Sequence, residues 1–180
     1  TITLTRCPAC GSEDIHEALE VRDHFSSGES FPLFDCARCA LRFTNRFPSE
    51  DSIGAYYDSP NYISHTDTRE GLANRLYHFA RGIMLKRKTR LVLKHTTHRP
   101  VRLLDMGCGT GYFLNEAKKK GFIVTGIEKD SRAREFAKAH FGLDVAEEKR
   151  FWELEKDAFH VVTLWHVLEH IEKLSQSIEK

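Results

Sequence analysis

The chain has 180 residues, enough for one well-buried core with a small additional module. Its 41% hydrophobic residues, 29% charged residues and net charge of +1 are those of an ordinary globular protein, and they exclude a disordered chain and a broadly basic nucleic-acid binder. The N-terminal sequence has no cationic segment followed by an apolar one, and no apolar run approaches the roughly 20 residues of a membrane span, so we expect a cytoplasmic location.

Two Cys-x-x-Cys pairs, Cys7 with Cys10 and Cys36 with Cys39, lie in the N-terminal quarter of the chain, separated by 25 residues. This spacing is typical of a four-thiolate zinc site rather than of disulfides. Short apolar or alternating stretches around the pairs, TITL, FPLFD and LRFT, predict small β-strands. Because so small a β module buries too little apolar surface to be stable alone, bound zinc would supply the missing stabilisation. We therefore expect a zinc-ribbon domain over residues 1–47, with a structural Zn²⁺ on the four cysteines.

The charge of this expected ribbon does not favour a nucleic-acid partner. Four thiolates leave zinc no open coordination position, so the metal is expected to be structural. A ribbon that grips nucleic acid would need basic and aromatic residues exposed on one face. Here five arginines are accompanied by seven acidic residues, so the segment is balanced in charge.

Residues 48–99 are expected to connect the ribbon to the main domain. The first part is rich in turn-forming residues and tyrosines, and it is either a packed bridge or a lid in which a ring such as Tyr62 contacts a ligand. The second part predicts a long amphipathic helix, interrupted near Gly82. Its second half is crowded with basic residues: Lys86, Arg87, Lys88, Arg90 and Lys94. Such a helix could contact RNA or an anionic lipid surface, although a solvated face is more common.

The stretch VRLLDMGCGTGYF predicts a strand, a glycine-rich turn and a helix. VRLLD is an apolar run typical of a buried parallel strand, and the following YFLNEAKKK ends in lysines before Gly121, as helices often do. In an α/β sheet this turn lies at the carboxyl edge of the strands, where ligands bind. Gly107, Gly109 and Gly111 allow positive φ angles and leave no side chains between a ligand and the backbone.

The residues around these glycines favour a cationic nucleoside as the ligand. Tyr112 stands where a dinucleotide fingerprint needs its third glycine, and the lysine of a Walker loop is absent. Asp105 ends the strand, where its charge would repel a pyrophosphate but could anchor an ammonium group. Glu128 ends the next expected strand, FIVTGIE, and an acid at this position can bind both ribose hydroxyls.

Three stretches, LLDMGCGTG, VTGIEKD and VVTLWHVLEHI, resemble motifs one, two and four of the class I S-adenosylmethionine-dependent methyltransferases, in a bacterial subgroup with Val-Leu-Glu-His after the fourth strand. The leading cysteine segment is similar to a zinc ribbon fused to several bacterial members. The resemblance implies an α/β fold with a Rossmann-like doubly wound parallel sheet over residues 100–180. The family's sheet has three further strands, so we expect an incomplete catalytic domain.

The resemblance also implies roles for single residues. The glycine loop, including Cys108, would lie against the aminoacyl and sugar portion of S-adenosylmethionine, with Asp105 supporting its ammonium and Glu128 binding its ribose. Trp165 and His166 would line the sulfonium or substrate side. Where the family usually begins the fourth strand with an acid, this chain has His160, so we expect a structural hydrogen bond to be lost.

A base for an oxygen nucleophile would come from a helix expected directly after the fourth strand. His166 and His170, four residues apart, could face the substrate there, or they could cap or pack the helix. A metal site of His166, Glu169 and His170 is the weaker alternative, since its spacing differs from His-Glu-x-x-His. Cys108 is expected to be a small loop residue rather than a nucleophile.

The leading functional prediction is methyl transfer to a small molecule, a sugar or a lipid-linked intermediate. An RNA methyltransferase whose ribbon recognises the substrate, and a non-enzymatic binding module, are the alternatives. If the sheet ends at the VVTL strand, that strand is an unprotected edge, and we expect self-association or domain exchange to cover it.

Overall fold

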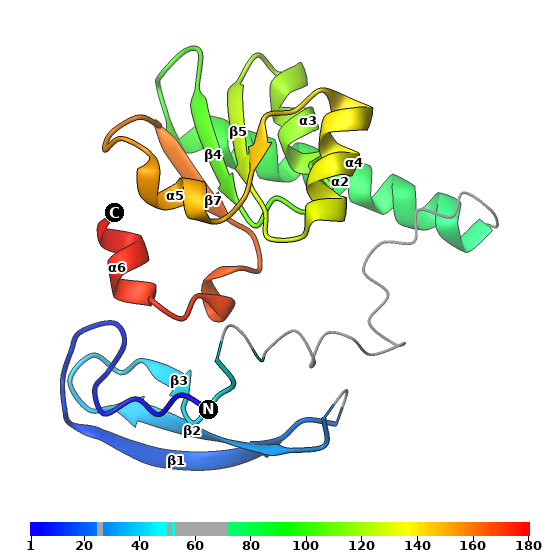
Figure 1. The fold of residues 1–180 in the computed structure, drawn as a ribbon. Helices are drawn as coiled ribbons and strands as arrows, with labels where there is room; N and C mark the ends of the chain where they lie inside the picture. Colours follow the sequence, from blue (N-terminus) through cyan, green and yellow to red (C-terminus); the bar gives the residue numbers. More distant parts are fainter. Residues whose placement is uncertain (25–26, 50–51, 53–71) are drawn as a thin grey trace. The chain divides into compact units, whose positions relative to one another are not determined.

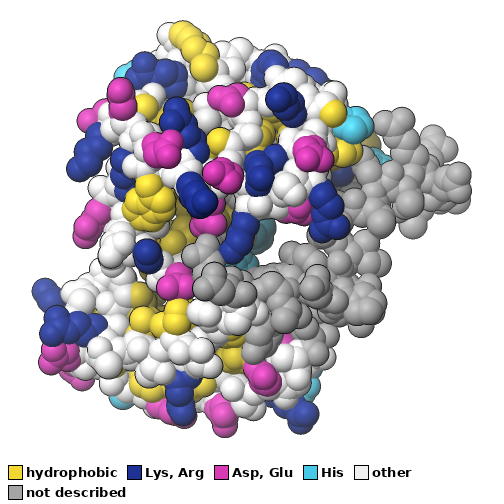
Figure 2. All heavy atoms as spheres, viewed as in Figure 1, with side chains coloured by type: hydrophobic (Ala, Val, Ile, Leu, Met, Phe, Trp, Pro, Cys, Tyr) yellow, Lys and Arg dark blue, Asp and Glu magenta, His cyan; other side chains and the backbone are white. Residues whose placement is uncertain are grey.

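The computed structural model describes residues 1–24, 27–49, 52 and 72–180, with residues 72–77 described by their backbone only. These residues divide into two compact units (Figure 1). The first unit holds the described residues of 1–67 together with Ile171–Lys180. The second unit holds the described residues of 68–170. On the face shown in Figure 2, basic and acidic side chains are interspersed over the described surface.

The first unit contains a three-stranded antiparallel sheet in the order β1-β2-β3, formed by β1 (Ile15–Arg22), β2 (Ser30–Cys36) and β3 (Arg42–Thr44). The predicted strands FPLFD and LRFT are present as β2 and β3. The predicted TITL strand is reduced to a single bridge between Ile2 and Phe47. Sequence analysis missed β1, because most of its side chains are exposed and its sequence has no strict apolar alternation.

The short helix α6 (Leu174–Glu179) also belongs to the first unit. The Ser175 hydroxyl donates a hydrogen bond to the backbone carbonyl of Pro8 beside the first cysteine pair. The last residues of the chain are therefore tied to its beginning within this unit.

The second unit contains a parallel sheet in the order β6-β5-β4-β7. Its strands are β4 (Arg102–Met106), β5 (Ile123–Ile127), β6 (Val145–Ala146) and β7 (Val161–Leu164). Strand β4 is central and pairs with both β5 and β7. Together with the antiparallel sheet that carries the cysteines, this confirms the predicted α/β fold class and its Rossmann-like parallel sheet.

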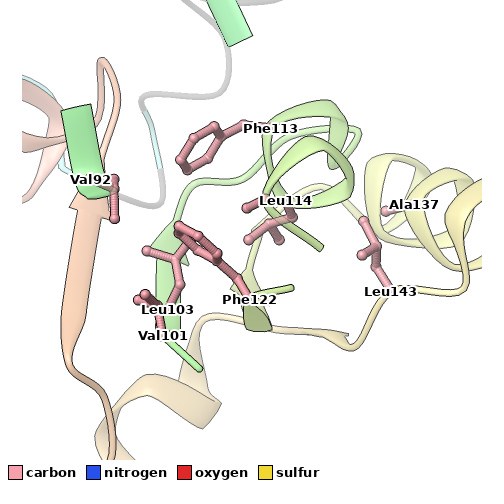
Figure 3. Close-up of a cluster of buried hydrophobic side chains, with 9 residues drawn as sticks. Val92, Val101, Leu103, Phe113, Leu114, Phe122, Ala137 and Leu143 are labelled. Carbon is pink, nitrogen blue, oxygen red and sulfur yellow. The ribbon is translucent and has the colours of Figure 1, made fainter. Parts of the chain in front are cut away.

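Helices cover both faces of the parallel sheet. Successive side chains of β4 point to opposite faces, so the strand contributes to a buried cluster on each of them. Leu103 lies in a buried cluster with side chains from α2 (Leu72–His95), α3 (Tyr112–Lys119) and α4 (Ser131–Phe141) (Figure 3). Leu104 and Met106 instead pack with Phe151 of α5 (Lys149–Glu153). The central strand is thus buried on both faces, which explains its continuous apolar run.

Helix α2 runs without interruption through Gly82, so the predicted break is wrong. A glycine in a helix interior costs only about 1 kcal/mol relative to alanine. Val92 of the same helix lies in the buried cluster, and packing of this kind outweighs the local penalty. No helix in the described part of the chain is long and apolar enough to cross a membrane.

Candidate functional site

The glycine-rich loop after β4 contains glycines with different structural roles. A Cβ atom at Gly107 would overlap the side chain of Val167, and one at Gly111 would lie 2.6 Å from Cδ1 of Leu143. Gly109 has a φ angle of 55°, and apart from its chain neighbours no described atom lies within 4 Å of where its Cβ would be. Gly107 and Gly111 therefore allow close packing, whereas Gly109 leaves open space beside the backbone, as a ligand needs.

Glu128, directly after β5, is held against this loop by two hydrogen bonds. Its Oε2 accepts from the backbone N–H of Gly109 at 2.7 Å, and its Oε1 accepts from the backbone N–H of Asp130 at 2.9 Å. The backbone N–H of Cys108 also donates to the carbonyl of Ile127 at 3.1 Å. The structure thus brings the predicted acid and the predicted glycine loop together at the carboxyl edge of the sheet.

Asp105 is the most buried charged group of the site, with 2% of its surface exposed. Its Oδ1 accepts a hydrogen bond of 2.6 Å from the Thr163 hydroxyl on the neighbouring strand β7. Burial raises the pKa of Asp105 from 3.8 to about 7, although the Thr163 hydrogen bond and the Lys88 charge oppose the shift. A cation bound nearby would lower this pKa again.

Lys88 of α2 acts electrostatically on Asp105 and contacts Trp165, which follows β7. The Lys88 ammonium lies 4.4 Å from the centre of the Trp165 ring, a cation–π contact. Burial lowers the pKa of Lys88, while the charge of Asp105 raises it. The Trp165 ring packs edge-on against Phe113 at 5.6 Å, and its Nε1 is buried without a hydrogen-bond partner among the described residues. A buried donor without a partner among the described residues suits a polar ligand.

Lys88 was predicted only as one of several residues on a solvated basic face, so its position near Asp105 and Trp165 was not predicted. Its neighbours Leu85, Thr89 and Val92 lie on the side of α2 that packs on the core. The spacing of these residues at three or four positions places Lys88 on the same side. This periodicity was the signal that could have identified it.

The predicted helix after β7 is absent, so the arrangement expected for the two histidines is wrong. His166 lies in a turn with a φ angle of 59°, and His170 ends the 3₁₀ helix η1 (Leu168–His170). Within the residues that the structure describes, the only group of three or more metal-ligating side chains is the cysteine cluster, so His166, Glu169 and His170 do not form a metal site. Beside this turn, Val167 packs on Gly107.

Two further expectations concern Cys108 and His160. Burial and the nearby charges of Asp105 and Glu128 raise the pKa of the Cys108 thiol, as befits a loop residue that is not a nucleophile. The expected loss of a structural hydrogen bond at His160 is wrong, because the His160 side chain makes such a bond itself. Its Nδ1 accepts from the backbone N–H of Arg102 at 3.0 Å, which replaces the missing carboxylate. Tyr62, the expected lid residue, lies outside the described residues.

The four N-terminal cysteines converge, with their sulfur atoms within 4.8 Å of one another. The Cys7–Cys39 and Cys10–Cys36 sulfur pairs are each 3.6 Å apart, and all four thiols are free. A regular tetrahedron of thiolates at about 2.3 Å from zinc would have edges of about 3.8 Å, whereas a disulfide would be about 2.0 Å long. The donor set and its spacing therefore fit a tetrahedral metal ion.

The burial of Asp105 predicts a stability that falls as the pH rises. Because the folded pKa of about 7 lies above the ordinary 3.8, the folded state holds the proton more tightly than the unfolded state. The contribution of Asp105 to the free energy of unfolding is therefore fully present below about pH 4, and it is lost as the pH rises through about 7. Asp105→Asn cannot ionise and keeps an acceptor for Thr163, so we expect the variant to melt at a higher temperature than the wild type at about pH 8, with a difference that shrinks towards about pH 4.

The control for this experiment is Asp144→Asn, which makes the same replacement at an exposed position. Thermal unfolding followed by tryptophan fluorescence would report on both variants. The explanation fails if Asp105→Asn and the wild type keep a constant difference in melting temperature at every pH.

Comparison with known proteins gives a family for the chain. A family model described as a methyltransferase domain matches residues 76–179, more than half of the chain. The mitochondrial ubiquinone biosynthesis O-methyltransferase of Schizosaccharomyces pombe is 29% identical over 108 residues, which cover 56% of this chain and 39% of that protein.

Solved structures are similar at lower identity. A SAM-dependent methyltransferase from Archaeoglobus fulgidus is 24% identical with a TM-score of 0.45, covering 54% of this chain and 46% of that one. The plantazolicin methyltransferase BpumL in complex with SAH is 22% identical with a TM-score of 0.45, covering 59% and 43%. The chain thus spans less than half the length of each of these proteins.

Proposed function

Because this chain belongs to the methyltransferase-domain family, we propose that it binds S-adenosylmethionine at the glycine loop and transfers the methyl group to a small-molecule acceptor. The observation that carries the proposal is the buried carboxylate of Asp105, which has no ion-pair partner within 4 Å among the described residues. A buried carboxylate without a close cation is costly, and an ammonium group in the ligand would offset that cost.

The residues of the loop fit the parts of this cofactor. We infer that Gly107, Cys108, Gly109 and Gly111 lie along the aminoacyl and sugar portion, since Gly109 leaves space there. Asp105 would bind the ammonium. Glu128 still has free lone pairs after its two backbone hydrogen bonds, and with them it would accept from the ribose hydroxyls.

The reacting end of the cofactor would lie towards Trp165 and His166. S-adenosylmethionine supplies a methyl group on a positively charged sulfur, and the protein must hold the acceptor in line with it and exclude water. Tyr62 remains a proposed lid residue, and His166 or His170 a proposed base.

Calorimetry with S-adenosylhomocysteine tests this function. We expect the full chain to bind it, and Glu128→Ala to weaken binding by about 1–3 kcal/mol, because charged hydrogen bonds to the ribose are lost. Glu135→Ala removes an exposed carboxylate from the neighbouring helix and should bind like the wild type. The loss caused by Glu128→Ala should be smaller for the analogue that lacks the ribose 2′-hydroxyl, which separates ribose binding from a general loosening of the loop.

Two results would contradict the proposal. One is a chain that binds NADH but not S-adenosylhomocysteine. The other is a Glu128→Ala variant that loses the same binding free energy for S-adenosylhomocysteine and for the analogue without the 2′-hydroxyl. This result would leave the Glu128 carboxylate with a role in loop structure alone.

We further propose that the first unit holds a structural Zn²⁺ on Cys7, Cys10, Cys36 and Cys39, supported by the convergence of their free thiols. Hydrogen bonds from the backbone N–H groups of Cys39 and Arg38 lower the pKa of Cys36 to about 7, which favours the metal-binding thiolate. The boundaries 1–47, 48–99 and 100–180, and the bacterial Val-Leu-Glu-His subgroup, remain parts of this proposal.

An RNA acceptor is the second candidate and is less well supported. Three arginines of the first unit form ion pairs with acids of the same unit: Arg6 with Glu13, Arg42 with Asp35 and Arg46 with Glu17. Paired arginines offer less charge to phosphates, so the ribbon does not provide a basic surface. Self-association through the edge strand β7, where Val162 is half exposed, also remains a proposal.

A further inference from the structure

Helix α2 concentrates the positive charge of the chain. Its 24 residues include seven Lys and Arg and no Asp or Glu. Since the whole chain carries +1, the remaining residues carry a net charge of −6. Such a separation of charge in a nearly neutral protein indicates a local function for the helix rather than a requirement for solubility.

The basic residues divide between two sides of the helix. Lys88 points inward to Trp165, whereas four others are exposed: Lys86, Arg87, Arg90 and Lys94. No Asp or Glu in the described part of the chain forms an ion pair with any of these four. The positive charge of the outer side therefore faces solvent without neutralisation by described residues.

Large apolar side chains share this outer side. Phe79 is 67% exposed, and Ile83, Met84 and Leu91 are also exposed. Phe79 and Ile83 are one helical turn apart. Lys86, Arg90 and Lys94 follow at further steps of three or four residues, so they lie on the same side of the helix. One face of α2 thus combines exposed apolar groups with cations that form no ion pair with a described residue, a combination that water alone does not favour.

We propose that this outer face of α2 docks the protein on an anionic lipid bilayer. Phe79 and its apolar neighbours would insert at the level of the acyl-chain boundary, and the long Lys and Arg side chains would reach up to the phosphates of the headgroups. An RNA strand would pair with the charges and stack a base on Phe79, but it would leave the aliphatic side chains of Ile83, Met84 and Leu91 exposed. The observed mixture therefore favours a lipid surface, and the helix would lie in its plane without crossing it.

The test is sedimentation of the full chain with vesicles. We expect binding to vesicles of phosphatidylcholine and phosphatidylglycerol in equal amounts, weak binding to phosphatidylcholine alone, and a decrease with added salt. Each Lys or Arg at an anionic surface contributes about a fivefold gain in affinity, so Arg87→Gln combined with Arg90→Gln should weaken binding about 25-fold. Phe79→Gln should also weaken it, because the apolar insertion is lost.

Matched controls keep the result specific to this face. Lys119→Gln combined with Lys138→Gln removes the same charge from exposed positions on α3 and α4. Ile178→Gln replaces a side chain of α6 that is 67% exposed, as Phe79 is. These variants should bind vesicles like the wild type, and circular dichroism should show that every variant is folded.

Three outcomes overturn the inference. They are no preference for the anionic vesicles, equal losses in the α2 variants and their controls, and vesicle binding that is insensitive to Phe79→Gln. If the chain bound oligouridine but not the anionic vesicles, and the arginine substitutions abolished the oligouridine binding, the face would be assigned to nucleic acid instead. None of these results depends on methyl transfer, so the proposed function is tested separately.

Discussion

Replacing Cys36 with serine is expected to abolish stoichiometric metal binding and to unfold the N-terminal unit. The sulfur atoms of the four cysteines lie within 4.8 Å of one another, and Cys7 and Cys36 are among the few buried side chains there. In zinc-finger peptides, bound zinc contributes an apparent free energy of about 10–16 kcal/mol to folding, far more than this small sheet could gain from burial. Elemental analysis would give the ratio of zinc to protein, and circular dichroism would follow the loss of the sheet.

The chain offers a matched control in its fifth cysteine. Cys108→Ser makes the same replacement in the glycine loop of the other unit, so this variant should retain one zinc per chain. A Cys36→Ser protein with a full equivalent of zinc, or a wild-type protein that takes up none after reconstitution, would refute the four-thiolate assignment.

Replacing Gly111 with alanine is expected to destabilise the second unit by about 2–5 kcal/mol. The φ angle of 79° at this position costs an alanine about 1–2 kcal/mol. The added Cβ would also lie 2.6 Å from Leu143 Cδ1 and 3.0 Å from Ala137 Cβ, both in the buried cluster, and overpacking of this kind costs about 1–3 kcal/mol. Urea unfolding followed by tryptophan fluorescence would measure the loss.

Gly121→Ala separates the two contributions. Gly121 has a φ angle of 83°, and no atom of the described residues beyond its chain neighbours lies within 4 Å of its Cβ position. Alanine at this position should therefore show the backbone cost alone. Equal losses at the two positions would mean that the contact of α3 with α4 does not require glycine.

The strand, the glycine turn and the position of the acid could be predicted because they are encoded locally. The apolar run of β4, the glycines behind it and the acid after β5 follow one another along the chain, and parallel pairing places Glu128 beside Gly109. Helix α4 is likewise bounded by local signals, since it begins after the N-cap Asp130 and ends before Gly142.

The parts that could not be predicted depend on tertiary contacts. The orphaned nitrogen of Trp165 and the inward position of Lys88 require knowledge of how α2 packs near β7. The left-handed turn at His166 stands next to the contact between Val167 and Gly107, which are 60 residues apart in sequence. Local propensity has no information about either contact, and at Gly82 it gave the wrong answer.

The two hydrogen bonds of Glu128 have a consequence for the order in which the protein can be built. Gly109 leaves the ribosome 19 residues before the carboxylate that holds its N–H group. A nascent chain that stops short of Glu128 therefore lacks the acceptor that fixes the loop. The hydrogen bond that holds Gly109 can form only when the second strand has been synthesised and has joined the first in register.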